Sequence, residues 1–289
     1  FRSDDARAGR LTAALSRCGF DRVFDAGVAA DLVALERLGE LLERWRAAVE
    51  GGGDGPPLPL LTSCCPGWVR FVEHFYPERR PHLSALRSPQ QAFGALAKTW
   101  YAERAGIDPS RIVSVALMPC EAGKLECNRP EMTASGRKDV DLGLTARELE
   151  RMLAQAGLDP EVLDVREFDE PFFGASGASL LGGATGGVIE STVRVFLELV
   201  CGLDAADVFP GGAVLPARGA EGVKYAALPL ERIADEVPPL LAERVQSFDW
   251  LAGRSLKVGV CHGAANARKV MEDIAAGGVF SECQIVEVM

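Results

Sequence analysis

Short apolar runs alternate with stretches of helical spacing along most of this chain. The run RIVSVALMPC predicts a buried strand that ends at Cys120, and SLKVGVC predicts another that ends near Cys261. A turn and then an amphipathic helix follow the second of these runs. Strands that alternate with helices predict an α/β protein, with two lobes of parallel β-sheet flanked by helices.

Other segments extend the same pattern. The spacing of DLVALERLGELLERWRAAV predicts a helix from about Asp31 to Val49, and LPLL predicts a short strand ending at Thr62. DVDLGL predicts a strand, and TARE after it is a capping box, with Thr145 as N-cap and Glu148 three residues on. The segments GGVIESTVRVFLELVCG and CQIVEVM predict a helix and a final strand.

Composition excludes several classes of protein. With 289 residues, the chain is long enough for one large domain or two lobes, and we treat 1–289 as one catalytic-type domain with GGGDGPP as a loop at 51–57. Its 31 Lys and Arg against 41 Asp and Glu give a net charge of −10, which argues against nucleic acid as a partner. No apolar run reaches about 18 residues, so no membrane span is expected.

Cysteine usage points to a reduced, cytoplasmic chain. No CxxC occurs, which argues against a zinc ribbon, a thioredoxin motif and a ferredoxin-type loop. No signal-peptide core is found at the N-terminus. The cysteines are expected either to pack or to ligate a metal from distant positions. They are Cys18, Cys64, Cys65, Cys120, Cys127, Cys201, Cys261 and Cys283.

Two adjacent thiols in TSCCPGW form the most unusual motif. Pro66 suits the first turn of a helix, so Cys64 and Cys65 are expected at a helix N-terminus, where the dipole favours thiolate over thiol. Both cysteines, like Cys120, come just after a predicted strand, and ligands of α/β sheets bind beyond such strand ends. A thiolate there can be a nucleophile, a metal ligand or a proton carrier.

Several motifs together resemble the catalytic domain of iron-only (FeFe) hydrogenases. They are TSCCPGW, SPQQ, MPCEAGKLE, DVDLGLTARELERML, GGATGGVIESTVR, GVCHGAANARKVMEDI and SECQIVEVM, and they follow the family's order over nearly the whole chain. The resemblance implies a metal site in the cleft between the two lobes. It implies the H-cluster there: a 4Fe–4S cubane joined through a cysteine sulfur to a two-iron unit with CO, cyanide and azadithiolate. The implied reaction is 2H⁺ + 2e⁻ ⇌ H₂.

The resemblance also assigns roles by motif position. Cys65 and Cys120 match ligands of the cubane, and Cys64 matches the thiol that passes protons to the bridgehead amine. Glu126 matches a structural acid. Positions that line or face the two-iron unit are matched by Pro89, Gln90 and Met289. The implied partners are a ferredoxin-type electron carrier, or an N-terminal iron–sulfur domain missing from this chain, and maturation proteins.

Two pocket positions depart from the family pattern. Gly123 stands where the motif MPCxxKxxE has the lysine that binds a cyanide, and Lys124 comes one residue late. Loss of that donor is expected to weaken anchoring of the two-iron unit. Gly182 in GGATGG replaces a bulky aromatic, which is expected to open space near the cluster.

The proton path departs too. The family relays protons from the thiol through a glutamate, a serine and a second glutamate. Arg37 falls at the first glutamate, whereas Ser84 and Glu40 keep the other two stations, and Glu36 is expected on another helix face. Because arginine cannot relay protons at neutral pH, we expect slow turnover, a different proton route, or a sensory role.

The remaining cubane ligands come, in the family, from a CPGGC-type stretch after EVM, and an APAVR-like stretch is expected upstream. This sequence has neither, so an incomplete sequence or a second chain is expected, with Cys261 and Cys283 as weaker substitute ligands. The alternative function is a hydrogenase-like sensory or cluster-assembly protein. A thiol enzyme using Cys64 with a histidine is disfavoured. Of the three histidines His74, His82 and His262, His74 is expected on a solvated helix face and His262 at a strand end.

Overall fold

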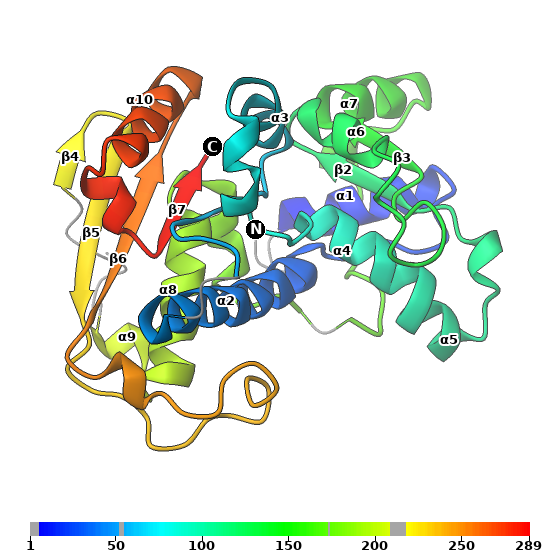
Figure 1. The fold of residues 1–289 in the computed structure, drawn as a ribbon. Helices are drawn as coiled ribbons and strands as arrows, with labels where there is room; N and C mark the ends of the chain where they lie inside the picture. Colours follow the sequence, from blue (N-terminus) through cyan, green and yellow to red (C-terminus); the bar gives the residue numbers. More distant parts are fainter. Residues whose placement is uncertain (1–5, 52–54, 173, 209–217) are drawn as a thin grey trace. The chain divides into compact units, whose positions relative to one another are not determined.

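The computed structural model describes residues 6–51, 55–172, 174–208 and 218–289 (Figure 1). The chain divides into two compact units. Unit 1 comprises Phe1–Val33 and Arg87–Leu180, and unit 2 comprises Ala34–Leu86 and Leu181–Met289. Of the predicted loop 51–57, residues 52–54 lie outside the described residues, and the flanking residues are neither helix nor strand.

Unit 2 is built on a five-stranded mixed sheet with the order β1-β7-β6-β5-β4. Strands β1 (Leu60–Leu61), β7 (Ile285–Val288) and β6 (Ser255–Cys261) are mutually parallel. Strands β5 (Val223–Pro229) and β4 (Arg218–Ala220) continue the sheet in antiparallel fashion. The parallel strands therefore form the part of the sheet from which Cys64, Cys65 and Met289 emerge.

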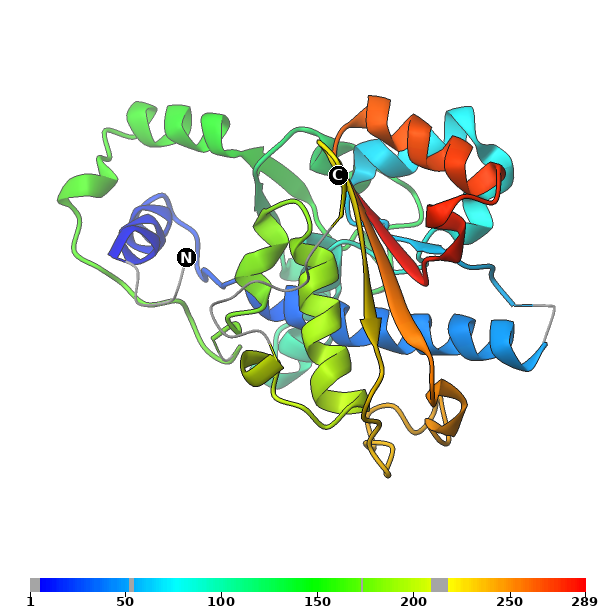
Figure 2. The same cartoon turned by 90° about the vertical axis from the view of Figure 1, so that its left-hand side faces the viewer.

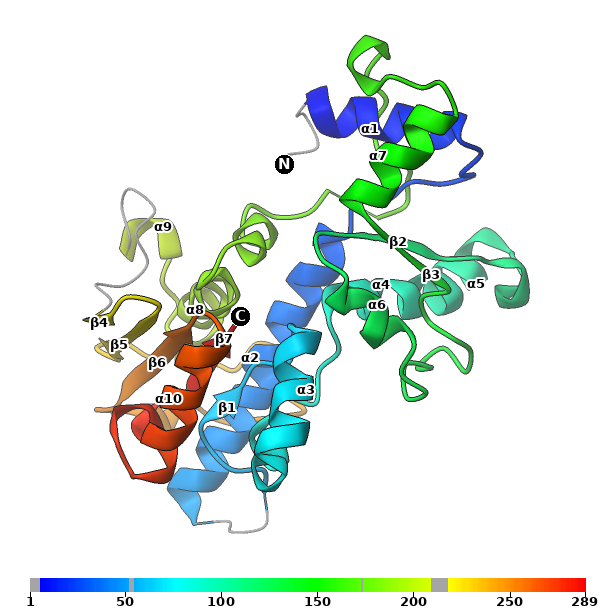
Figure 3. The same cartoon turned by 90° about the horizontal axis from the view of Figure 1, so that it is seen from above.

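The two faces of this sheet belong to different hydrophobic clusters. Because side chains alternate along a strand, Leu60 and Ile285 join helices α2 (Gly27–Glu50) and α8 (Gly187–Val200) on one face. Their neighbours Leu61 and Val286 join α3 (Pro66–Phe75) and α10 (Ala264–Ala275) on the other. Figures 2 and 3 show α8 and α10 on opposite sides of the sheet. All four residues of β7 are buried, as a strand covered on both faces requires.

Unit 1 carries a small parallel sheet of β2 (Val115–Met118) and β3 (Leu142–Thr145), with helix α6 after β2 and α7 after β3. Its largest cluster of buried apolar residues brings the first helix against α7 through Ala14, Leu15, Leu149 and Leu153. The helices of unit 1 are α1 (Ala6–Arg17), α4 (Pro89–Leu96), α5 (Ala102–Ala105), α6 (Ala122–Cys127) and α7 (Ala146–Gln155). Unit 2 also contains the short helix α9 (Ala205–Val208).

The α/β fold class and most predicted elements are confirmed. Helix α2 begins four residues before the predicted start at Asp31 and ends one residue after Val49. The capping box is present in full, since Thr145 Oγ1 accepts from the Glu148 N–H and the Glu148 carboxylate accepts from the Thr145 N–H. A rigid local motif of this kind depends on few distant contacts, which is why it could be predicted.

Two predictions about the sheets were wrong in detail. RIVSVALMPC forms a strand only over Val115–Met118, and Leu117 in it is 40% exposed, so the strand is not buried. It belongs to a two-stranded sheet, of which one face stays in contact with solvent. The larger sheet is not wholly parallel, because β5 runs antiparallel to β6. The turn before β5 contains Gly222 at φ +75°, a backbone conformation that favours glycine.

Among the described residues, none of the helices combines the length and the apolar character that crossing a membrane would require.

Candidate metal and proton-transfer site

The adjacent cysteines lie where β1 gives way to α3. Cys65 is the N-cap of α3 in extended conformation, and Pro66 occupies the first helical turn, as predicted. The stretch before them is held by buried Thr62, whose hydroxyl accepts a 3.3 Å hydrogen bond from the Val288 N–H. Cys64 and Cys65 are both free thiols. The fold thus holds the two thiols at the parallel strand ends of unit 2.

The expected bias of Cys64 toward thiolate was wrong. Burial of its thiol raises the pKa of Cys64 to about 11, although Arg37 and a hydrogen bond with Thr62 act in the opposite direction. Loss of solvation outweighs the two groups that favour the charged form, and the charges of Glu287 and Cys65 add to the upward shift of the pKa. Cys64 therefore carries its proton at neutral pH, which suits a proton donor better than a nucleophile.

Arg37 is the cation whose charge lowers the pKa of the Cys64 thiol. It projects from α2 with only 5% of its surface exposed, and its Nη1 donates to Thr192 Oγ1 at 3.2 Å. Burial lowers the pKa of Arg37, whereas the charges of Cys64, Glu287 and Glu40 raise it. The arginine that replaces the family's glutamate is thus a buried, charge-compensated group. Glu36 is half-exposed and pairs with Arg244, as the different helix face predicted.

Glu287 is the acidic partner that the sequence reasoning missed. It is fully buried on β7, and its carboxylate accepts from the N–H groups of Gly186 at 2.6 Å and Ile189 at 2.8 Å. These donors belong to the first turn of α8, where a negative charge is stabilised. Burial still raises the pKa of Glu287, while the two N–H donors and Arg37 lower it. The sequence did contain a signal for this buried acid, because Glu287 is the one charged residue in the otherwise uncharged run QIVEVM.

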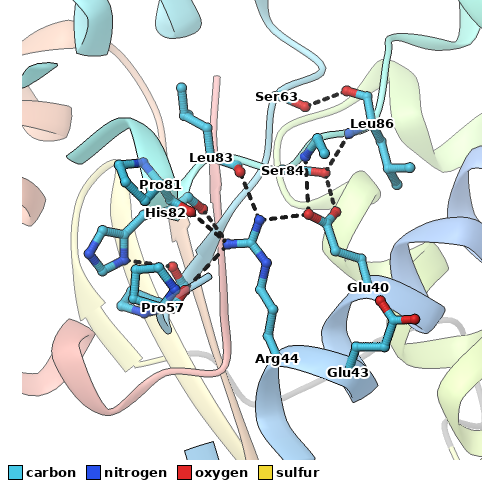
Figure 4. Close-up of polar contacts among 12 residues, drawn as sticks. Glu40, Glu43, Arg44, Pro57, Ser63, Pro81, His82, Leu83, Ser84 and Leu86 are labelled. Atoms are coloured by element: carbon cyan, nitrogen blue, oxygen red, sulfur yellow. Dashed lines mark hydrogen bonds and ion pairs between the residues drawn. The ribbon is translucent and has the colours of Figure 1, made fainter. Parts of the chain in front are cut away.

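Ser84 and Glu40 are in direct contact (Figure 4). Ser84 Oγ donates to Glu40 Oε2 at 2.5 Å, and Glu40 Oε1 accepts from Arg44 Nη2 at 2.6 Å and from the Ala85 N–H at 3.0 Å. Arg44 also donates to a ring of backbone carbonyls, those of Pro57, Pro81, His82 and Leu83. Ser84 and Glu40 are therefore held in a buried polar network.

Two further positions expected near the metal group, Met289 and Gly182 of GGATGG, also lie in unit 2. Met289 is fixed by its backbone, which donates to the Cys261 carbonyl at 3.0 Å and accepts from the Gly263 N–H at 2.7 Å. At Gly182 an added Cβ would meet no atom within 4 Å, so the space next to this residue is open. Gly187 is different, because a Cβ there would overlap the Leu181 carbonyl oxygen.

Unit 1 holds Cys120, a free and exposed thiol just after β2. Close to it in sequence, Glu126 is buried, and its carboxylate accepts from Ser88 Oγ at 2.5 Å and from Gln90 Nε2 at 2.7 Å. Pro89 is the first residue of α4, between these two donors. The structural role expected of Glu126 is visible in this network, which ties α6 to the start of α4.

Lys124 is committed elsewhere in the same unit. Its ammonium contacts both carboxylate oxygens of Glu148, the capping-box residue of α7, at 2.5 Å. The hydrogen bonds from Lys124 and Thr145 lower the pKa of Glu148 to about 2. Lys124 thus neutralises a neighbouring acid, and it does not stand in for a lysine at position 123.

The other cysteines lie in apolar surroundings. Cys261 and Cys283 belong to one buried cluster, and burial raises their pKa values to about 11 and about 12. Such thiols are poor substitutes for cubane ligands. Cys18 packs with the α1–α7 cluster, Cys201 is buried in the core of unit 2, and Cys127 is buried on α6. Within the described residues, no three Cys, His, Asp or Glu side chains converge as a ready metal site.

The histidines show no catalytic arrangement with Cys64. His74 is exposed on α3, and its Nε2 receives a 3.4 Å hydrogen bond from Arg70. His82 is mostly buried, with Nδ1 3.1 Å from the Pro59 carbonyl oxygen. His262 is exposed at the end of β6 and contacts Thr185. His74 is thus on an exposed helix face and His262 at a strand end, as expected, and His82 is a buried residue bonded to a backbone carbonyl.

Comparison with known proteins decides the family. The family model described as "Iron only hydrogenase large subunit, C-terminal domain" matches residues 1–289. This chain belongs to the iron-only hydrogenase family. It is 38% identical over 283 residues to the NADP-reducing hydrogenase subunit HndD of Solidesulfovibrio fructosivorans, covering 96% of this chain and 43% of that protein.

Relatives of this iron-only hydrogenase domain include proteins of another kind. The chain is 34% identical over 212 residues to the cytosolic iron-sulfur assembly component 3 of Pongo abelii, covering 71% of this chain and 44% of that protein. Among solved structures, the [FeFe]-hydrogenase HydA1 from Chlamydomonas reinhardtii superposes with a TM-score of 0.76 at 31% identity, covering 99% of this chain and 71% of that one. The chain spans less than half the length of these curated relatives.

The residues of this hydrogenase-family domain fit the family's metal groups in part. Cys65 and Cys120 are free and accessible, as cubane ligands must be, and the indole N–H of buried Trp68 on α3 has no partner among the described residues. The segment at Gly123 does not fit the anionic ligands of a two-iron unit, because the adjacent Lys124 is paired with Glu148. Cys65 and Cys120 are thus each present as a free thiol, and Gly123 supplies no charge.

Proposed function

We propose that this domain belongs to an iron–sulfur oxidoreductase that interconverts protons, electrons and H₂, with slow turnover. Family membership and the protonated thiol of Cys64 support the proposal. A 4Fe–4S cubane with a two-iron unit, when bound, supplies the redox chemistry. Cys65 and Cys120 are proposed as two of the cubane's ligands.

The chain's own residues provide a path for protons in unit 2. Ser84 donates to Glu40 at 2.5 Å, and Glu40 is held by Arg44, so a proton can pass between the hydroxyl and the carboxylate without rearrangement of the backbone. Cys64 holds the proton that is delivered last. The family's carboxylate between Cys64 and Ser84 is missing, since Arg37 occupies its position, and this gap is the reason for proposing slow turnover.

The partners follow from the same proposal. Electrons are proposed to arrive through a ferredoxin-type carrier or an iron–sulfur domain of the full-length protein, in a cytoplasmic setting with maturation proteins. Pro89, Gln90, Gly182 and Met289 are proposed to face the two-iron unit.

A second candidate is a sensory or cluster-assembly protein with a cubane and little hydrogen turnover. Two observations favour it. Arg37, which cannot relay a proton, stands where the relay needs a carboxylate and is bonded to Thr192. The ammonium of Lys124 is paired with Glu148. One of the relatives is named as a cytosolic iron-sulfur assembly component and not as a hydrogenase, and this name also supports the second candidate.

The deciding experiment is maturation of the full-length protein followed by infrared spectroscopy and an H₂ assay. Bands of metal-bound CO and cyanide together with H₂ formation would support the first candidate. Cubane iron without such bands would support the second. Cys65→Ser and Cys120→Ser should lower bound iron, whereas the matched control Cys18→Ser, which alters a cysteine packed against α7, should not.

A further inference from the structure

One buried hydrogen-bond donor beside the proposed cubane ligand of unit 2 lacks an acceptor. The side chain of Trp68 is 4% exposed, and its indole Nε1–H has no partner among the described residues. An indole N–H can only donate, and burying it without an acceptor is unfavourable. Trp250 of the same unit shows the usual arrangement, because its Nε1 donates to the Ser247 carbonyl at 3.0 Å. The orphan N–H of Trp68 therefore indicates an acceptor that the described residues do not provide.

The indole belongs to the first turn of α3, next to Cys65. Cys65 is the N-cap of this helix, and Trp68 is its third helical residue. Side chains at these two positions lie on the same side of a helix, which is why they meet in a capping box. The Cys65 sulfur leans over this turn, since a Cβ built at Gly67 would lie 3.8 Å from Cys65 Sγ. Cys65 also packs against the buried cluster to which Trp68 belongs.

The surroundings of the indole favour sulfur as its acceptor. Its ring stacks on that of Phe71, with the centroids 5.9 Å apart. The buried cluster around Trp68 consists of apolar side chains and the thiols of Cys261 and Cys283. A buried water molecule bonds to about three polar groups, and this cluster offers few. The sulfides and thiolates of a cubane carry negative charge into such a site and accept N–H bonds there.

We propose that the Trp68 indole N–H donates a hydrogen bond to a sulfur of the iron–sulfur group that Cys65 would hold, and so raises the reduction potential of that group. The inference rests on the proposed function, because it concerns the cubane that the domain would bind. A reduced cubane carries one more negative charge than an oxidised one, so a fixed N–H donor stabilises the reduced form more. Trp68 thereby makes it easier for the cubane to accept an electron from its carrier.

Pulsed electron paramagnetic resonance of the full-length protein, with its cubane reconstituted and reduced by dithionite, tests the contact directly. Labelling the indole nitrogens of tryptophan with ¹⁵N should produce a nitrogen coupling to the electron spin of the reduced cubane. That coupling should disappear in Trp68→Phe. It should remain in Trp250→Phe, the matched control, whose N–H is already bonded to Ser247. A parent protein with a reduced cubane and no indole coupling would overturn the inference, even if Trp68→Phe failed to fold.

Redox titration of the same samples gives the second readout. Trp68→Phe should disfavour reduction of the cubane about threefold to tenfold, and tenfold is about 59 mV for one electron. Benzothienylalanine at position 68, which keeps the bicyclic shape and lacks the N–H, should give the same shift. Phe71→Leu is the packing control, because it disturbs the stacked ring and removes no N–H.

The outcomes separate the inference from the proposed function. An equal shift in Phe71→Leu and in Trp68→Phe, or an unchanged potential in Trp68→Phe with the cubane bound, would overturn the role of Trp68 alone. A parent protein that binds no cubane would overturn both, because the donor would then have no sulfur to reach. A shift confined to the two replacements at position 68, together with loss of the nitrogen coupling, would support the hydrogen bond.

Discussion

Replacing Arg37 tests the account of the interrupted proton path. Arg37 is 5% exposed and donates to Thr192, and its charge is balanced by Glu287 and Glu40. Arg37→Gln removes the cation and keeps a polar side chain. Arg37→Glu removes the cation and adds the carboxyl group that the relay lacks.

The magnitude follows from the groups left behind. Losing one hydrogen bond from a charged donor costs about 1.5–3 kcal/mol. The buried carboxylates of Glu287 and Glu40 also lose the favourable charge interaction with Arg37. Glu287 keeps two N–H donors from α8, which softens the second term. We therefore expect Arg37→Gln to lower the free energy of unfolding by about 3 kcal/mol at neutral pH.

The pH dependence has a definite sign. Burial already raises the pKa of Glu287, and Arg37 is the cation that lowers it, so removal of Arg37 raises that pKa further. A carboxyl group whose pKa is higher in the folded state binds its proton more tightly there. The stability gained from this tighter proton binding is complete below the unfolded pKa of the carboxyl group and is lost as pH rises through its folded pKa. The deficit of both variants should therefore shrink as the pH falls from neutral toward the unfolded pKa of a glutamate, about 4.3.

Urea unfolding across this pH range is the assay, with Arg46→Gln as the matched control on α2. Arg46 pairs weakly with Glu50 at the surface, so its loss should change stability by less than about 0.5 kcal/mol at every pH. A deficit that does not change with pH would refute the coupling of Arg37 to Glu287. In the loaded enzyme, Arg37→Glu should raise turnover by about tenfold or more over Arg37→Gln. Equal rates would show that protons travel by another route.

Three further results are expected. Ser84→Ala removes the hydroxyl bonded to Glu40 and should cost about 1.5–3 kcal/mol in urea unfolding and slow H₂ formation; an unaffected rate would exclude Ser84 from the path. Lys124→Met should lower Tm above about pH 4.5, and the difference should narrow as pH falls toward 2, because the lowered pKa of Glu148 contributes stability only while the carboxyl is ionised. Gly182→Phe should unfold within about 0.5 kcal/mol of the parent, since no atom lies near its Cβ; a large loss would show that the position is not open.

Local sequence signals predicted the parts of the site that depend on neighbouring residues. Pro66 predicted the start of α3, and Thr145 with Glu148 predicted the start of α7. Family motifs also placed Ser84 and Glu40 as successive relay stations, and the two side chains are in contact. In these cases one or two residues determine the geometry.

Properties that depend on distant packing could not be read from the sequence. The pKa of Cys64 is set by burial and by charges on α2 and β7, so the helix dipole alone predicted the wrong direction. The pairing of Lys124 with Glu148 joins residues 24 positions apart, and no local signal predicted it. The antiparallel hairpin of β4 and β5 was missed because its short segments carry no strong alternation of apolar and polar residues.

The central claim is tested most directly by the infrared spectrum of the full-length protein after maturation, recorded before and after desalting. The account predicts bands of metal-bound CO and cyanide that weaken on desalting, because Gly123 supplies no cation for the anionic ligands and Lys124 is paired with Glu148. A spectrum without any such bands, in protein that carries its full complement of cubane iron, would contradict the claim that this domain supports hydrogen conversion.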